Sequence, residues 1–403
     1  MNILVLASEY PYEKDKNADR TKVVGYFARE WVKKGHNVVA IVDSSSFPSA
    51  YYAVGDRLKA LVTRTFDVSR TPDRIWSKRF SYDADGVHVE NIPMIKYIPH
   101  GRFSEKVISK QIKEIEKILQ ERNFVPDLIT GHWVNPQIML VPVLARRYVA
   151  KSAFVFHADY MEANCKKFNV QKYIDQIDHI GFRSKSAAEL AKQYLKFKEE
   201  PFVASSGVPD EFIEKYSEAP VREIGVSTLH IITAARLVEY KKIDTIISAA
   251  AKAFDGNAFE LTIAGDGPLK SKLIEQAREL GINDNVHFIG QIARDVLQDR
   301  MRRSDIFVLI SRRETFGLVY IEAMLHGCIV IASRFGGVDG IIEDGVNGFL
   351  CEEGNVEELI DIFKRIKKMP LDEMENISKN ATITAANYSE SKVACHYIEC
   401  VQR

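Results

Sequence analysis

SDIFVLISRRETFGLVYIEAMLHGCIVIAS, residues 304–333, predicts a strand, a helix and a second strand. Its apolar runs at 305–310 and 328–333 are short and rich in β-branched residues, which is typical of buried parallel strands. The apolar segment between them, 316–327, has the length of a buried helix. Two such strands joined by a helix form the repeating unit of a parallel α/β sheet.

The same alternation runs through the second half of the chain. Three more short apolar strands are predicted at 229–235, 259–265 and 285–290. Helical patterns separate them at 242–254, 268–280 and 294–304, the second with a proline in its first turn. We therefore expect an open, doubly wound parallel sheet, whose ligands bind beyond the carboxyl ends of the strands.

The first half repeats this scheme less regularly. Strands are predicted at 2–7, 37–43, 86–94, 127–133, 153–159 and 179–184, and residues 53–86 form a basic, aromatic insertion. A Ser-Gly-Pro stretch, SSGVPDEF (205–212), marks a domain boundary. We expect two Rossmann-like domains facing across a cleft, at 1–206 and 207–385, and a helix at 386–403 that returns to the first domain.

Composition narrows the class of protein. The 403 residues carry 55 basic and 55 acidic side chains, so no overall positive charge recommends a nucleic acid as partner. Five cysteines without paired spacing suit reduced thiols in a cytosolic protein. No signal-peptide pattern and no long apolar span are present, which predicts a cytoplasmic protein that is free to lie on the inner face of the membrane.

Two glutamates flank the predicted turn after the strand at 305–310. Glu314 lies at the strand's carboxyl end and Glu322 lies on the helix that follows. The N–H groups of Phe316, Gly317 and Leu318 open that helix and make an anion site. Carboxylates beside a bound phosphate suggest acceptors for sugar or ribose hydroxyls. Alternatively, Glu314 is an ordinary helix-start acid and Glu322 lies on a solvated face.

The corresponding turns of neighbouring strands carry cations and glycines. Arg236 and Lys241 follow the first strand of the second half and suit a diphosphate, although Lys242 is an alternative to Lys241. Surface charges leading into a helix would give the same pattern. Gly265 and Gly267 allow a tight turn and close approach of a ligand, but an ordinary strand-to-helix turn also fits.

Histidines end two strands of the first half. His157, followed by Asp159, and His132 are placed to face a ligand, although a lone histidine is more often structural. Their spacing does not support a metal site. We interpret the pair Asp83 and Asp85 as part of a polar loop and not as a cation site.

The basic, aromatic insertion ends in a candidate surface for an anionic acceptor or a membrane. Its candidate residues are Arg74, Trp76, Lys78 and Arg79. A lysine-rich amphipathic helix at 102–123 adds to this character, although an ordinary helix covering the sheet would have the same pattern.

The ordered motifs of the second half resemble those of a known family. The segment from Ile231 to Leu350 is similar to the donor-binding domain of retaining glycosyltransferases with the GT-B fold, in glycosyltransferase family 4. The motifs that carry the resemblance are ARLVEYKK, IAGDGPLKSKL, NVHFIGQI, SDIFVLISRRETFGLVYIEAMLHGCIVIAS and GGVDGIIEDGVNGFL. The first half resembles the family's first domain in outline.

The resemblance implies a role for each matching position. Glu314 lies beside the donor sugar and Glu322 binds the ribose, while Arg236 and Lys241 hold the diphosphate and stabilise it as a leaving group. The implied donor-binding residues are Arg236, Lys241, Gly265, Phe288, Ile289, Glu314, Phe316, Gly317, Leu318, Val319 and Glu322. The implied catalytic residues are Glu314, His157, Arg236 and Lys241.

Three positions depart from the family's pattern. Ala18 and Asp19 stand where relatives often have a Gly-Gly pair, and Ser206 replaces the asparagine of the hinge. Gly340 stands where a glutamate is common, so that contact is absent or comes from Asp339.

The resemblance implies a retaining, metal-independent transferase without a cofactor. It would move a sugar from a nucleotide diphosphate, with UDP favoured, to a hydroxyl of a glycan or lipid-linked acceptor in bacterial cell-surface polysaccharide or glycoconjugate synthesis. The alternatives are an epimerase or phosphorylase on the same fold, or a non-catalytic nucleotide-sugar binding protein.

Overall fold

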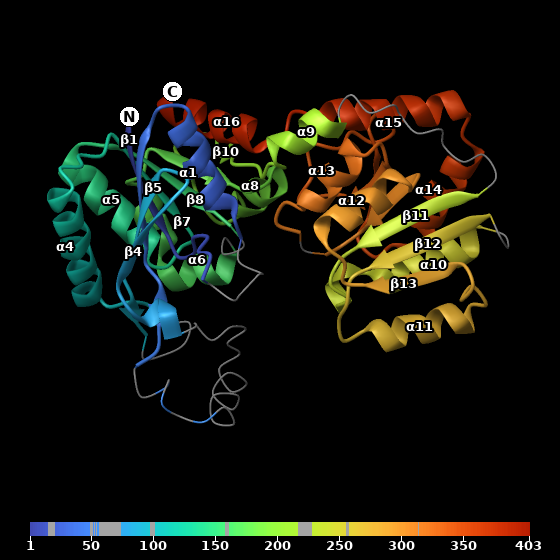
Figure 1. The fold of residues 1–403 in the computed structure, drawn as a ribbon, viewed down its shortest axis with the longest axis horizontal. Helices are drawn as coiled ribbons and strands as arrows, with labels where there is room; N and C mark the ends of the chain where they lie inside the picture. The colour runs from blue at the N-terminus through green and yellow to red at the C-terminus, as the bar shows by residue number, and fades with distance from the viewer. Residues whose placement is uncertain are drawn as a thin grey trace. The chain divides into compact units, whose positions relative to one another are not determined.

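A computed structural model describes most of the chain, as two compact units (Figure 1). The described residues are 1–14, 21–48, 51, 53, 55, 74–96, 101–157, 161–216, 228–254, 258–312 and 314–403. Unit 1 comprises Met1–Arg183, Ala188–Ala204 and Ala394–Arg403, and unit 2 comprises Ser184–Ala187 and Ser205–Val393. Each unit is built on its own sheet. The facing of the two domains across a cleft stays a prediction.

Unit 1 contains an eight-stranded sheet in the order β10-β9-β8-β7-β1-β2-β5-β4. All neighbouring strands pair in parallel except β4 and β5, which are antiparallel. The strands are β1 (Asn2–Ala7), β2 (Asn37–Val42), β4 (Phe80–Ala84), β5 (Val87–Asn91), β7 (Leu128–His132), β8 (Lys151–Phe156), β9 (His179–Phe182) and β10 (Phe202–Val203). A second, two-stranded sheet pairs β3 (Ser45–Ser46) with β6 (Met94–Ile95) in parallel.

The helices of unit 1 follow its strands and cover the sheet. α5 packs against β7 and β8, and α1 packs against β2 and β5. The described helices are α1 (Val23–Lys33), η1 (Arg74–Ser77), α4 (Glu105–Glu121), α5 (Gln137–Tyr148), α6 (Glu162–Phe168) and α7 (Val170–Ile174). The predicted amphipathic helix at 102–123 is confirmed as α4: Ser104 caps it by accepting the Val107 N–H, and its isoleucines are buried.

The predicted insertion at 53–86 is wrong at its carboxyl-terminal end. Its last residues form β4, which pairs with β5 through a hairpin. Asp85 and Gly86 make the turn with φ of 51° and 79°, the left-handed values that two-residue hairpins favour. The predicted polar loop is therefore a hairpin, with Asp83 in its strand and Asp85 at its turn. Residues 56–73 lie outside the described part of the chain.

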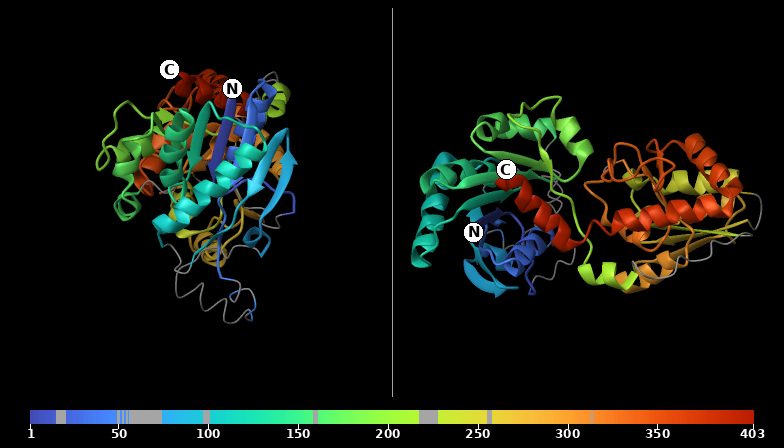
Figure 2. Two further views of the ribbon diagram at one scale, coloured as in Figure 1. Left: turned by 90° about the vertical axis from the view of Figure 1, so that its left-hand side faces the viewer. Right: turned by 90° about the horizontal axis from the view of Figure 1, so that it is seen from above.

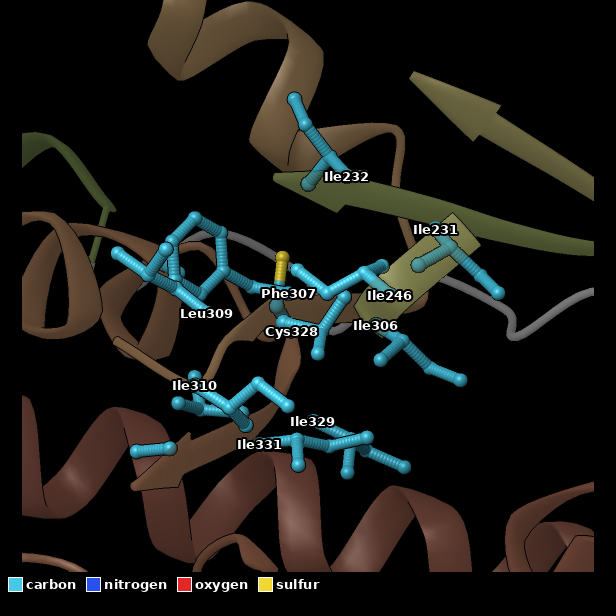
Figure 3. Close-up of a cluster of buried hydrophobic side chains, with 14 of the residues drawn as sticks. Ile231, Ile232, Ile246, Ile306, Phe307, Leu309, Ile310, Cys328, Ile329 and Ile331 are labelled. Atoms are coloured by element: carbon cyan, nitrogen blue, oxygen red, sulfur yellow. The ribbon is translucent and has the colours of Figure 1, made fainter. Parts of the chain in front are cut away.

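Unit 2 contains a wholly parallel six-stranded sheet in the order β13-β12-β11-β14-β15-β16. The strands are β11 (Leu229–Ala234), β12 (Phe259–Ala264), β13 (Val286–Gly290), β14 (Ile306–Leu309), β15 (Ile329–Ser333) and β16 (Phe349–Cys351). The first five confirm the strands predicted for this half. Figure 3 shows how apolar side chains of β11, β14 and β15 gather around the helix residue Ile246 in a buried core.

Helices alternate with these strands, as the sequence predicts. They are α9 (Asp210–Tyr216), η2 (Glu239–Lys241), α10 (Ile243–Ala253), α11 (Lys270–Glu279), α12 (Arg294–Arg302), α13 (Leu318–Leu325), α14 (Val356–Lys368) and α15 (Leu371–Ala385). Two helices, α8 (Lys185–Ala191) and α16 (Glu390–Gln402), include residues of both units.

The segments that connect the units are fixed by backbone contacts. Within unit 2, the Val208 N–H donates to the Tyr388 carbonyl and the Glu390 N–H donates to the Val208 carbonyl. A Cβ on Gly207 would lie 2.5 Å from the Glu390 nitrogen, so the two segments require glycine there. In unit 1, the end of α16 lies beside the amino terminus, where Gln402 contacts Met1 (Figure 2).

Candidate active site

The turn between β14 and α13 is built around Gly317. This residue has φ of +81°, and a Cβ there would lie 2.5 Å from the Tyr320 ring and 2.8 Å from Cγ of Glu314. Glycine therefore lets the chain turn directly from the strand into the helix. The first N–H groups of a helix have no acceptor within the helix, so those of Leu318 and Val319, at the start of α13, suit an anion.

Neighbouring elements hold this turn in place. The Tyr320 hydroxyl donates to the Leu309 carbonyl at 2.7 Å, and burial raises the pKa of Tyr320 above its usual range. Ser333, at the end of β15, donates to the Ser311 carbonyl at 2.8 Å. A Cβ on Gly337 would lie 2.5 Å from the Phe316 carbonyl oxygen. The loop after β15 thus packs directly on the turn that carries the amides.

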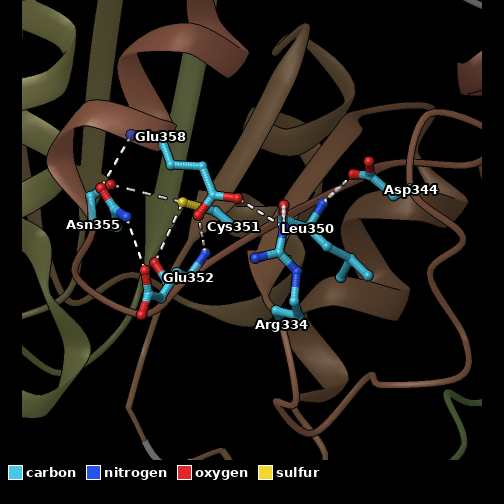
Figure 4. A network of polar contacts seen from close by, with 7 residues as sticks. All are labelled: Arg334, Asp344, Leu350, Cys351, Glu352, Asn355 and Glu358. Atoms are coloured by element: carbon cyan, nitrogen blue, oxygen red, sulfur yellow. Dashed lines mark hydrogen bonds and ion pairs between the residues drawn. The ribbon is translucent and has the colours of Figure 1, made fainter.

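A polar network secures the outer end of that same loop (Figure 4). Arg334 donates to the Leu350 carbonyl at 3.1 Å and to the Glu358 carboxylate at 2.7 Å. Asp344 accepts the Leu350 N–H at 2.8 Å, and Asn355 caps α14. Gly340 of this loop has φ of +80°, which disfavours a residue with a side chain, such as glutamate, at this position.

Lys241 reaches Glu314 from the neighbouring strand-to-helix turn. The two side chains form an ion pair and are only 13% and 19% exposed. The Ser311 hydroxyl donates to Glu314 at 3.4 Å. The Lys242 side chain lies beside Gly354 and not beside Glu314. Lys242 is the residue that precedes α10, and its φ is 55°. Lys241, and not Lys242, is therefore the lysine that contacts Glu314.

Arg236 lies on the loop after β11, which packs on two glycines. A Cβ on Gly265 would lie 1.9 Å from the Ala235 carbonyl oxygen, and one on Gly267 would lie 2.5 Å from the Leu237 carbonyl oxygen. The Leu237 N–H donates to the Asp266 carbonyl at 3.0 Å. Arg236 is exposed and forms no ion pair with a carboxylate of the described residues, so its charge is available to an anion.

Glu322 is held by an arginine that sequence reasoning missed. Glu322 is 6% exposed, which contradicts the alternative of a solvated face. Arg294 donates to its Oε1 through Nε at 3.0 Å and also through Nη2. The Arg294 guanidinium lies 5.0 Å from the Phe212 ring centroid. Burial raises the pKa of Glu322, and Arg294 opposes that shift.

The sequence gives a faint signal for this arginine. Arg294 is the first residue of α12, where the helix dipole favours acids and not bases. A base at that position suggests a carboxylate partner elsewhere in the fold, but 28 residues separate it from Glu322.

Phe288 and Ile289 lie on β13, at the edge of the unit 2 sheet, and both are half-buried. Beyond them, the Gly290 carbonyl accepts the Gly265 N–H at 2.7 Å, which joins β13 to the turn after β12. The candidate donor residues of unit 2 thus lie in or next to the strand-to-helix connections of one sheet.

In unit 1, His157 and His132 form a buried pair. His157 Nε2 lies 3.1 Å from His132 Nδ1, and the His157 ring stacks on Trp133 with the centroids 4.1 Å apart. Burial, followed by the nearby Arg183, lowers the pKa of His132 to about 3 and that of His157 well below its usual value. Both rings are therefore neutral near pH 7. Asp159 lies outside the described residues.

The histidine pair predicts a fall in stability in acid. His132 has a pKa of about 3 when folded and of 6.5 when unfolded, so the unfolded state binds more protons between these values. Stability is fully present above pH 6.5 and is lost as the pH falls. We expect wild-type protein to lose about 1.4 kcal/mol more than the His132→Gln variant between pH 7.5 and 5.5.

Chemical denaturation followed by circular dichroism at the two pH values measures this difference. Burial raises the pKa of Asp43 to about 7, so protonation of Asp43 makes the folded protein more stable as the pH falls. This contribution is the same in wild type and variant, and the comparison of the two removes it. Equal losses of unfolding free energy in the two proteins would contradict a lowered pKa of His132 in the folded state.

The predicted surface around the insertion is wrong for Trp76. Its side chain is 0% exposed and packs against Tyr12 and Phe80, and η1 packs against β3. Arg79 pairs with Glu114 of α4 at 3.1 Å, and Lys78 is exposed. The Arg74 side chain lies outside the described part, as do Ala18 and Asp19.

Two further expectations concern metals and thiols. All five cysteines are free, and their reduced state stays a prediction. Within the described ranges, no three His, Cys, Asp or Glu side chains come together as metal ligands. Independence from metals stays a prediction.

Comparison with solved structures identifies the class of fold. A glycosyltransferase from Rickettsia africae aligns over 100% of this chain and 97% of its own, with a TM-score of 0.67 at 17% identity. The Anabaena protein HepE in complex with UDP aligns over 100% of both chains, with a TM-score of 0.66 at 17% identity. The protein therefore has the GT-B fold, with two Rossmann-like domains.

Sequence comparison then shows which family the second half of the chain is similar to. Residues 220–384 match the family model of glycosyl transferases group 1. An N-acetyl-alpha-D-glucosaminyl L-malate synthase of Bacillus anthracis is 32% identical over 35% of this chain and 37% of its own length. An alpha-monoglucosyldiacylglycerol synthase of Streptococcus pneumoniae is 23% identical over 66% and 63%. The chain thus covers less than two thirds of these relatives. The similarity to the group 1 glycosyl transferases thus lies in residues 220–384.

Proposed function

We propose that the protein is a retaining glycosyltransferase that uses a nucleotide diphosphate sugar, with UDP as the favoured nucleotide. The observation that carries the proposal is the grouping of Lys241, Glu314 and the free amides of α13 at one turn. Cations and amides suit the diphosphate, and carboxylates suit the hydroxyls of sugar and ribose. The complex of HepE with UDP supports the choice of nucleotide.

The ion pair between Lys241 and Glu314 suggests a role for each residue in donor binding. When the donor enters, its diphosphate competes with Glu314 for the Lys241 ammonium. Glu314 is then released to accept hydroxyls of the sugar. As the sugar–phosphate bond breaks, negative charge grows on the leaving diphosphate, and Lys241 and Arg236 stabilise it.

The remainder of the step needs no protein nucleophile. The acceptor hydroxyl attacks the anomeric carbon on the face that the diphosphate leaves, so that configuration is retained. The departing phosphate oxygen takes the acceptor's proton, which balances the reaction. We propose His157 of unit 1 as a neutral hydrogen-bonding partner of the donor sugar.

The acceptor belongs to the same proposal. We propose a hydroxyl of a glycan or lipid-linked acceptor, used in the synthesis of bacterial cell-surface polysaccharide or glycoconjugates by a cytoplasmic enzyme that contacts the membrane face. The name of the Streptococcus pneumoniae relative, an alpha-monoglucosyldiacylglycerol synthase, supports this class. None of the helices in the described ranges is both long and apolar enough to cross a bilayer.

A ligand screen tests the proposal. Thermal shifts are measured with UDP, GDP and ADP and with their sugars, with and without EDTA. A ligand at 100 times its dissociation constant adds about 2.7 kcal/mol of stability. We expect UDP or a UDP-sugar to stabilise the protein, with no effect of EDTA. No shift with any nucleotide would contradict the proposal.

Product analysis separates the alternatives. An epimerase would change the donor sugar without an acceptor, a phosphorylase would require inorganic phosphate, and a binding protein would leave the donor intact. A transferase would release the nucleotide diphosphate and form a new glycoside with unchanged anomeric configuration.

We expect Arg294→Met to weaken nucleotide binding about tenfold to a hundredfold. Arg294 orients Glu322 through a single oxygen and opposes the rise in its pKa that burial causes, so the loss of Arg294 raises the pKa of this buried carboxyl further. Binding should then recover as the pH rises, because ionisation restores Glu322 as an acceptor. Calorimetric titration of UDP between pH 5 and 8 measures this dependence.

Two variants sharpen this test. Arg294→Lys should restore part of the affinity, and Arg294→Met should add little to Glu322→Gln, because both act through one carboxylate. Additive losses in the double variant would show that Arg294 acts independently of Glu322.

A further inference from the structure

Three cations of unit 1 gather near two phenylalanines at one edge of the sheet. Lys96 directly follows β6, Arg102 precedes α4, and Lys167 lies near the end of α6. The chain reaches these segments from β5 and β8, so they lie beyond the carboxyl ends of strands, like His157. We call Lys96, Arg102 and Lys167 the cation cluster.

One hydrogen bond and the Phe168 ring connect Arg102 with the end of α6. The Arg102 guanidinium donates to the Lys166 carbonyl at 3.2 Å, which ties the segment before α4 to α6. The Arg102 guanidinium and the Lys167 ammonium lie 5.9 and 5.7 Å from the Phe168 ring centroid. Two cations thus share one ring.

Lys96 is the most enclosed of the three. Its ammonium lies 5.0 Å from the centroid of Phe103, a side chain that is only 7% exposed. Burial, followed by repulsion from Lys167, lowers the pKa of Lys96 to about 8. The charged form of Lys96 is therefore destabilised by its surroundings, and a bound anion would offset this cost in free energy.

No acid within the described ranges neutralises the cluster. The neighbouring Lys166 pairs with Glu162, and Arg79 pairs with Glu114, but no carboxylate of these residues pairs with a member of the cluster. A guanidinium and two ammonium groups supply only donors, which suit phosphate or carboxylate oxygens.

We propose that Lys96, Arg102 and Lys167 bind a phosphate or carboxylate group of the acceptor. The inference rests on the proposed function, in which the first domain holds the acceptor. It replaces the surface predicted around Trp76, which the fold buries. The anionic group comes either from a soluble acceptor or from a lipid headgroup, and the experiment below distinguishes the two.

The test follows the Lys96 ammonium directly. Lysines of the full chain are labelled by reductive methylation with ¹³C-formaldehyde, which keeps their charge, and the Lys96 signal is assigned by its absence in Lys96→Met. Inorganic phosphate, acetate, phosphatidylglycerol vesicles and phosphatidylcholine vesicles are then titrated. Lys117 of α4, which pairs with Glu121 on an exposed face, is the control signal.

We expect phosphate or phosphatidylglycerol to raise the pKa of Lys96 toward its ordinary value and to saturate. Lys167→Met should by itself raise the pKa of Lys96 and weaken the anion response at least fivefold. A response to phosphate and acetate indicates a soluble acceptor. A response to phosphatidylglycerol alone, without one to phosphatidylcholine, indicates a lipid headgroup.

Two outcomes would overturn the proposal: no response of Lys96 to any anion, or equal responses of Lys96 and Lys117. The readout is independent of the donor site. Failure of the nucleotide screen would therefore remove the proposed transferase without deciding the subsite, and failure at Lys96 would remove the subsite alone.

Discussion

Lys241→Ala is expected to lower the turnover of the nucleotide sugar by about two orders of magnitude, or about 3 kcal/mol of transition-state stabilisation. The Lys241 ammonium lies in an ion pair with Glu314 and is only 13% exposed. In so enclosed a place its charge acts strongly on a leaving diphosphate. The measurement is release of the nucleotide diphosphate under saturating donor.

Lys242→Ala is the matched control for this prediction. The neighbouring residue has the same side chain, but it lies beside Gly354 and away from Glu314. Its removal should leave turnover within about twofold of wild type. Near-wild-type turnover in a purified, folded Lys241→Ala protein would contradict the proposal that Lys241 stabilises the leaving diphosphate.

Gly265→Ala is expected to destabilise the protein by about 3 kcal/mol or more and to abolish nucleotide binding. Gly265 has φ of +133°, and a Cβ there would lie 1.9 Å from the Ala235 carbonyl oxygen. The substituted turn must move away from the loop that carries Arg236. Thermal unfolding, with nucleotide titration of the fraction that folds, measures both effects.

Gly281→Ala is the control that separates the effect of backbone strain from the steric clash with Ala235. Gly281 also has a positive φ, of +69°, but nothing lies within 4 Å of a Cβ placed there. We expect it to cost only about 1 kcal/mol and to leave nucleotide affinity unchanged. If Gly265→Ala behaves like Gly281→Ala, the close packing of the two loops does not support the site.

Much of the second unit follows from its sequence. The alternation of short β-branched runs with longer helical patterns predicts five of its six strands, because a buried parallel strand needs a short run that is apolar on both faces. β16 is the exception. It has only three residues, too few for a periodic signal.

The first unit shows where sequence patterns fail. Charges interleaved with aromatics suggested an exposed surface around Trp76, but spacing does not tell which aromatic side chain packs inward. The hairpin of β4 and β5 lets η1 place Trp76 against Tyr12 and Phe80, and the indole is fully buried.

By itself, the sequence determined the class of both sheets, the turns that carry the candidate residues, and the places of Glu314 before α13 and Glu322 on it. These features are local, because strand period, helix starts and glycine turns are set by neighbouring residues. Only the tertiary structure decided that Lys241 and not Lys242 reaches Glu314, that Arg294 holds Glu322, and that Lys96 and Lys167 lie together. Those pairings join residues from different strand-to-helix connections, and the register of the strands, not their sequence, brings them into contact.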